Sequence, residues 1–129
     1  MTVVEINTND CLNLVDYPNK PSERFFANQQ HIQDLHVYEP IVFKCYNCKY
    51  EIEFKEGNFQ KHSNSAFSNL QNNDKMLLED YKNKNRLLLF SFLDFYCPKC
   101  GQGTQILYED SYGGKSEYLI SIKNVLIIK

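Results

Sequence analysis

Two CxxC pairs constrain this chain more than any other feature of its sequence. The first is Cys45-Tyr46-Asn47-Cys48 and the second is Cys97-Pro98-Lys99-Cys100, and together they hold four of the five cysteines. Two such pairs supply the four thiolates of a tetrahedral zinc site. Because four protein sulfurs leave no position for water or substrate, we expect one zinc ion that builds the fold and does no chemistry. Its predicted ligands are Cys45, Cys48, Cys97 and Cys100.

The residues that follow each pair bear on how the chain turns around an ion. Pro98 presets φ for a tight reversal, and Gly101 can take the positive φ with which the chain leaves it. Lys49 stands where the first pair would need the equivalent glycine. The first pair is therefore weaker as an isolated motif, but it remains half of a matched set.

A CxxC pair followed by CPxCG resembles the zinc ribbons, in which two knuckles at the ends of short β-hairpins clamp one zinc. The resemblance covers roughly residues 37–56 and 87–128. The chain departs from the family because 48 residues, 49–96, separate the pairs, against the about 15–20 usual for the pattern. We expect a single domain, 1–129, with an inserted segment at 57–86. Since loop-closure cost grows only logarithmically with length, the insertion does not weaken the metal prediction.

Two other interpretations of the cysteines stay open at this point. A rubredoxin-like iron site also contains a CPxCG half, and the cysteines could form disulfides or a redox pair. The first residues, MTVVEINTNDCLNLV, have no basic stretch followed by an apolar one, as a secretory signal would. Paired cysteines in a reducing compartment are typical of metal ligands, so we expect a cytoplasmic zinc protein.

Composition and charge limit the classes of function. A chain of 129 residues with 43% apolar content can bury about two thirds of its unfolded surface. The longest apolar run, 87–93, is too short and too interrupted to cross a bilayer. The formal net charge is −2, and a zinc with four thiolates adds two positive and four negative charges, which brings it near −4. Nucleic-acid binders usually carry a basic domain, so we expect weak binding to nucleic acid.

Hydrophobic periodicity predicts an α+β fold, with an antiparallel sheet, the cysteine knuckles at one end of it, and one or two helices packed on a face. Expected strands are 2–6, 37–44, 50–55, a central strand at 87–96, and a hairpin of 104–109 and 117–128 around a turn at 111–114. Expected helices are 22–36, with Ser22 as N-cap, and 76–86. The polar stretch 58–75, with Phe59, Phe67 and Leu70 as its apolar anchors, is expected to be an exposed loop or marginal helix.

The remaining candidate residues do not form a recognisable catalytic site. Cys11 has the apolar residues Leu12 and Leu14 close after it and is expected to be a small buried residue. His31 and His36 do not share a helix face, and His62 has no partner in the sequence. The chain contains no GxGxxG, P-loop, GxSxG or HExxH motif, so we expect a non-enzymatic protein.

Two functions of different class follow. The first is a protein-binding module that presents two surfaces, the acidic segment 1–40 and the loop 58–75, both expected to be dispensable for the fold. Its small size and negative charge resemble, in general character, bacterial immunity proteins that bind and neutralise a toxin, and complementary charge would speed association. The second is a nucleic-acid-binding or transcription-associated zinc ribbon. Lys44, Lys49 and Lys99 flank the knuckles and could either meet phosphates or offset the negative zinc–thiolate charge.

Overall fold

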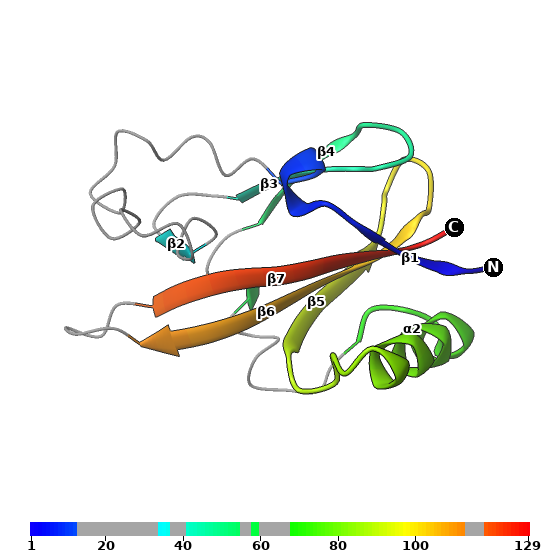
Figure 1. Ribbon diagram of the computed structural model, residues 1–129. Helices are drawn as coiled ribbons and strands as arrows, with labels where there is room; N and C mark the ends of the chain where they lie inside the picture. The colour runs from blue at the N-terminus through cyan, green and yellow to red at the C-terminus, as the bar shows by residue number, and fades with distance from the viewer. Residues whose placement is uncertain (13–33, 37–40, 55–57, 60–67, 113–117) are drawn as a thin grey trace.

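The computed structural model describes residues 1–12, 34–36, 41–54, 58–59, 68–112 and 118–129. This part of the chain is mostly antiparallel sheet with a single α-helix, which agrees with the predicted α+β class (Figure 1). The main sheet contains β1 (Val3–Ile6), β2 (Asp34–His36), β5 (Ser91–Tyr96), β6 (Gly103–Tyr112) and β7 (Tyr118–Ile128). A separate hairpin contains β3 (Ile41–Lys44) and β4 (Glu51–Phe54), and the helix is α2 (Asn72–Lys84). A short 3-10 turn, η1 (Thr8–Asp10), follows β1.

The last strand, β7, lies at the centre of the main sheet. It pairs with β6 along one edge, and β6 pairs in turn with β5. Along its other edge β7 pairs with β1 at residues 125–128 and with β2 at residues 119–121. The predicted strand at 2–6 and the predicted C-terminal hairpin are therefore confirmed, with shifted ends.

Both faces of the main sheet are covered. The β3–β4 hairpin packs on one face, and α2 lies against the other (Figure 1). A register shift between Leu107 and Tyr108 places an extra β7 residue in the ladder, as in a β-bulge. Because of that extra residue, Ile122 and Val125 can both face the hairpin although they are three positions apart.

Two apolar clusters fill these layers. The first core cluster, on the hairpin side, includes Phe43, Phe59, Ile106, Tyr108 and Ile127. The second core cluster, on the helix side, includes Leu70, Leu78, Leu107, Leu126 and Ile128. Alternate residues of β6 and β7 thus enter opposite clusters, which is why these strands read as continuous apolar runs.

The predicted helix at 22–36 is wrong at its end. Residues 34–36 form β2, which pairs with β7 through Leu35 opposite Ile120. Pairing with a long neighbouring strand outweighs the helical spacing of the local sequence, because tertiary contacts routinely override propensity. Residues 22–33, with the proposed cap Ser22 and His31, lie outside the described residues.

The predicted central strand at 87–96 is wrong in two respects. The strand begins at Ser91, and within the described residues it lies at the sheet edge, next to β6 only. Arg86 has φ 59°, and the Leu87 N–H donates to the Lys82 carbonyl at 2.8 Å, so the chain leaves α2 in a tight turn before β5 starts. Leu93 and Asp94, which point to opposite faces of the sheet, are both buried. Because both faces of β5 are covered, its sequence resembles that of a central strand.

The described residues of the inserted stretch, 58–59 and 68–86, differ from the prediction. The helix begins at Asn72 and not at residue 76, so residues 72–75 belong to α2. Phe59 is fully buried, and its ring centroid lies 5.1 Å from that of Tyr108 in an edge-on arrangement. This side chain is part of the core and is not a free anchor for a partner, while Phe67 and His62 lie outside the described residues.

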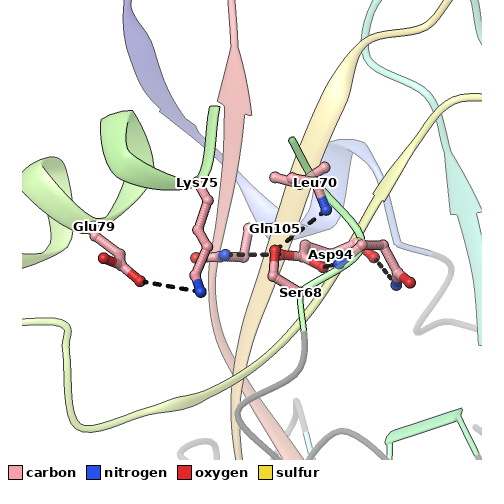
Figure 2. Close-up of polar contacts among 7 residues, drawn as sticks. Ser68, Leu70, Lys75, Glu79, Asp94 and Gln105 are labelled. Atoms are coloured by element: carbon pink, nitrogen blue, oxygen red, sulfur yellow. Dashed lines mark hydrogen bonds and ion pairs between the residues drawn. The ribbon is translucent and has the colours of Figure 1, made fainter. Parts of the chain in front are cut away.

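A buried carboxylate ties the residues before α2 to the edge strand (Figure 2). Asp94 accepts hydrogen bonds from the Ser68 hydroxyl at 2.6 Å, the Asn69 N–H at 2.7 Å and the Gln105 side-chain amide at 3.2 Å. The Asn69 side-chain amide also donates to the Asp94 carbonyl at 2.7 Å. The expectation that 58–75 is dispensable for the fold is therefore wrong for Ser68 and Asn69.

Candidate metal centre

The two cysteine pairs occupy two turns that meet at one end of the molecule (Figure 1). Cys45 and Cys48 lie between β3 and β4, and Cys97 and Cys100 lie between β5 and β6. All four Sγ atoms are within 4.8 Å of one another, and within the described residues they could hold one metal ion. The fold thus brings together the four ligands predicted from the sequence, although 48 residues separate the pairs.

The sulfur–sulfur distances suit an ion better than disulfides. Two sulfur–sulfur separations between the turns are 3.5 Å for Cys45 to Cys100 and 3.6 Å for Cys48 to Cys97. A disulfide would need about 2.05 Å. Four sulfurs at about 2.3 Å from a tetrahedral ion stand about 3.8 Å apart, close to the observed values. All five cysteines are free thiols, and a tetrahedral set of four sulfurs suits zinc and iron–sulfur centres.

The two turns share one backbone hydrogen-bond pattern. The Lys49 N–H donates to the Cys45 carbonyl at 2.9 Å, as the Gly101 N–H does to the Cys97 carbonyl at 2.8 Å. The N–H groups of the two leading cysteines donate in turn to the carbonyls of Tyr50 and Gln102, at 2.8 and 2.9 Å. Each turn therefore closes in the same way, and each carries its two sulfurs on the same side.

Lys49 takes the conformation that glycine takes in the second turn. Its φ is 68°, and that of Gly101 is 79°. Left-handed backbone costs a residue with a Cβ about 1–2 kcal/mol. The Lys49 ammonium donates to the Tyr46 carbonyl at 3.4 Å. The absence of glycine after the first pair thus leaves its geometry unchanged.

Backbone N–H groups surround the sulfurs with matched spacing in the two turns. The leading cysteine of each turn accepts from the second and third following N–H groups, and the trailing cysteine accepts from the second following one. The donors are Asn47 and Cys48 to Cys45, Tyr50 to Cys48, Lys99 and Cys100 to Cys97, and Gln102 to Cys100. Such donors stabilise thiolates, which are the form that binds a metal.

The second turn favours thiolates more than the first. The Asn47 side-chain amide and the Gln102 N–H lower the pKa of Cys100 to about 6. Burial alone would raise the pKa of Cys97, but N–H groups and the neighbouring sulfurs lower it overall. Burial raises the pKa of Cys45 to about 12. In Cys48 the Tyr50 N–H lowers the pKa, but burial and the Cys97 sulfur raise it overall. A cation among the four sulfurs would therefore be needed to keep all of them deprotonated.

Two side chains that contact the sulfurs are absent from the sequence-based prediction of the site. Asn47 donates its side-chain amide to Cys100 across the two turns. The Cys45 thiol donates to the Gln102 side-chain oxygen at 3.8 Å, again across the turns. Side chains around metal ligands commonly orient them, and both positions are inside or directly after a CxxC pair. That placement is the one sequence signal that could have identified them.

The surface beside the sulfurs is aromatic and basic. Cys45 and Cys97 are buried, whereas Cys48 is half-buried and Cys100 is exposed. The exposed ring of Tyr46 lies near two ammonium groups, those of Lys49 and Lys129, each 5.6 Å from its centroid. The other flanking lysines predicted from the sequence, Lys44 and Lys99, are exposed. Lysine residues therefore lie in or directly beside both cysteine turns in the sequence, and two ammonium groups lie near the Tyr46 ring.

Cys11 takes no part in this centre. It is buried, and its Sγ lies 3.6 Å from the Thr8 carbonyl. Burial, with a smaller effect of Asp10, raises the pKa of this thiol to about 12. The expectation of a small buried residue is confirmed, and His36, expected on a helix, lies in β2.

Comparisons with protein-family models, with curated proteins and with solved structures find no match to this chain. Among the described residues, no helix is both long and apolar enough to cross a membrane.

Proposed function

We propose that this chain is a non-enzymatic protein whose fold depends on one structural zinc ion, held by Cys45, Cys48, Cys97 and Cys100. One observation carries the proposal: four sulfurs from two distant turns lie within 4.8 Å of one another. A set of four protein ligands leaves no open coordination position for catalysis. The matched N–H groups around the sulfurs support the same interpretation, because they serve thiolates in both turns alike.

The choice of zinc over iron rests on the structural role proposed for the centre. Paired thiols in a reducing compartment such as the cytoplasm are typical of metal ligands, and a tetrahedral set of four sulfurs suits zinc or iron. Zinc has no redox chemistry, which fits a centre that only holds two turns together. Optical spectra of the purified protein test the choice, since an iron tetrathiolate absorbs visible light and a zinc one does not.

We infer that the biochemical role is to bind a protein partner. The metal joins the β3–β4 hairpin to the end of β5, and so stabilises a scaffold on which surface residues are held in place. The more specific version is an immunity protein that neutralises a bacterial toxin. Small size and a net charge of −2 support it by general resemblance alone.

The test of this role is reconstitution with a purified partner. Zinc-loaded protein is cross-linked in its native host, the adduct is identified by mass spectrometry, and the two proteins are mixed in pure form. The proposal expects a defined complex on size-exclusion chromatography and, for the toxin version, loss of the partner's toxic activity. A purified pair that does not associate would refute the role.

A second candidate, nucleic-acid binding, is favoured by one observation. Tyr46 is 38% exposed and has two ammonium groups 5.6 Å from its ring centroid, and aromatic rings beside cations can stack bases while the cations meet phosphates. Fluorescence anisotropy with a single-stranded oligonucleotide at physiological salt tests it. Submicromolar binding that Tyr46→Ala abolishes would make this the better function, whereas binding no tighter than about 10⁻⁴ M leaves the protein-binding role.

A further inference from the structure

Two adjacent leucines stand exposed in the turn between α2 and β5. Leu89 is 99% exposed and Leu88 is 51% exposed. Single exposed apolar residues are ordinary on protein surfaces. Two neighbouring exposed leucines in one turn are less common. They place two large apolar side chains in water, although a turn made of polar residues would fold as well.

The turn that carries these leucines is fixed at both ends. After α2 the chain turns at Arg86, whose φ is 59°, and the Leu87 N–H donates to the Lys82 carbonyl at 2.8 Å. The side chains on either side of the pair, Leu87 and Phe90, pack against the second core cluster. A partner that took up the leucines would therefore need to order little of the turn, and such preorganisation favours binding.

The sequence on either side of the leucines is basic. Residues 81–93 contain Lys82, Lys84 and Arg86 and no acidic residue. The Lys82 ammonium is occupied with the Phe92 ring, 4.2 Å from its centroid, and that of Lys84 with Asp80 at 3.1 Å. Within the described residues the exposed Arg86 has no ion pair, so one unpaired guanidinium adjoins the leucine pair.

One cation and two leucines suit a protein pocket better than a membrane. Segments that hold anionic membranes by charge usually cluster about 4–8 basic residues. Arginine, in contrast, is enriched among the residues that dominate protein interfaces, where it commonly pairs with carboxylates at the edge of a desolvated apolar contact. Charge complementarity therefore points to a protein surface with an apolar pocket and an acidic rim.

We propose that Leu88 and Leu89 insert into such a pocket of a partner protein while Arg86 pairs with its acidic rim. This inference rests on the protein-binding role proposed above and names the surface that performs it. The turn lies just before the start of β5, and Cys97 and Cys100 follow the end of that strand. Six strand residues span about 20 Å, so the leucines can be altered without disturbing the metal centre.

The experiment places a photo-crosslinking residue, p-benzoylphenylalanine, at position 89 of the zinc-loaded full-length chain in its native host. The matched position is Asn83, which is exposed on α2. The captured protein is then purified and titrated by calorimetry with the parent, with Leu88→Ser/Leu89→Ser, with Arg86→Glu and with Met76→Ser. Met76 is an apolar residue 66% exposed elsewhere on α2 and serves as the control.

We expect an adduct with one protein from position 89 and none from position 83. The double leucine variant should bind that protein at least about 30-fold more weakly, Arg86→Glu should also bind more weakly, and Met76→Ser should bind like the parent. Equal melting temperatures and zinc contents show that the variants fold.

Three results would overturn the inference. If the partner binds the double leucine variant as tightly as the parent, the surface is wrong although the protein-binding role stands. If phosphatidylserine-containing vesicles bind the parent and not the double variant, and position 89 yields no protein adduct, the occupant is a membrane. If neither position yields a protein adduct and vesicles do not bind, the inference fails, and the reconstitution described above then decides the role by itself.

Discussion

Lys49 and Gly101 occupy equivalent positions in the two cysteine turns and share one left-handed backbone conformation, with φ of 68° and 79°. The same hydrogen bonds close both turns, so the geometry does not depend on which residue is present. What differs is the conformational cost, because a side chain at positive φ is strained and glycine is not.

Exchanging the residue types at these positions should change stability in opposite directions. Gly101→Ala should lower the free energy of unfolding by about 1 kcal/mol, because an added Cβ meets no atom within 4 Å and only the backbone cost remains. Lys49→Gly should raise it by about 0.5 kcal/mol, since relief of strain is partly cancelled by glycine's greater unfolded entropy. Urea denaturation of zinc-loaded protein measures both. A Lys49→Gly variant that is as destabilised as Gly101→Ala would show that the two turns are not equivalent.

Acidification should release the metal more easily from an Asn47→Ala variant. The Asn47 amide is the largest cause of the low Cys100 pKa, about 6 against an ordinary 9.0. A lowered pKa stabilises the folded chain fully above pH 9.0, and that contribution is lost as the pH falls through about 6. Without the amide the pKa of Cys100 rises, so protons should displace the ion at a higher pH and metal affinity should fall about tenfold.

A chromophoric chelator, followed over a series of pH values, measures this release. Asn73→Ala is the control, because Asn73 is an exposed amide on α2. Identical release midpoints for the two variants would mean that Asn47 does not support Cys100.

Loss of the Asp94 carboxylate should destabilise the fold strongly. This buried group accepts from Ser68, Asn69 and Gln105, and Asp94→Ala would leave those donors unpaired. We expect a loss of about 3 kcal/mol, and of about 1 kcal/mol for Ser68→Ala. Glu79→Ala, which removes only an exposed 4.0 Å ion pair with Lys75 (Figure 2), should change stability by less than about 0.5 kcal/mol. Chemical denaturation measures all three, and an Asp94→Ala variant no weaker than Glu79→Ala would contradict the assigned role.

The sequence was informative where local pattern and structure coincide. Alternation of Ile52 and Phe54 with acidic residues identified β4, and the spacing of the four cysteines identified the candidate metal site. Both signals are local, since strand alternation and the CxxC turn each depend on a few adjacent residues.

The sequence-based predictions are wrong where contacts between residues far apart in the chain decide the structure. Residues 34–36 became a strand because β7 offers them an edge, and no local spacing reveals that pairing. The sequence around Ser68 and Asn69 is typical of a loop. Their role in the fold depends on hydrogen bonds to Asp94, which lies 25 positions beyond Asn69. Phe59 was expected at the surface because its neighbours are polar, yet its ring meets Tyr108 in the core.

X-ray absorption at the zinc edge of the purified protein decides whether four cysteine sulfurs hold one zinc ion. We expect one zinc per chain with four sulfur neighbours at about 2.3 Å and no nitrogen or oxygen neighbour. Cys97→Ser should lose the metal and its cooperative melt, because structural zinc contributes on the order of 10–16 kcal/mol of apparent binding energy in small domains. Protein that folds without metal, or a zinc with fewer than four sulfur neighbours, would show that the proposed site is wrong.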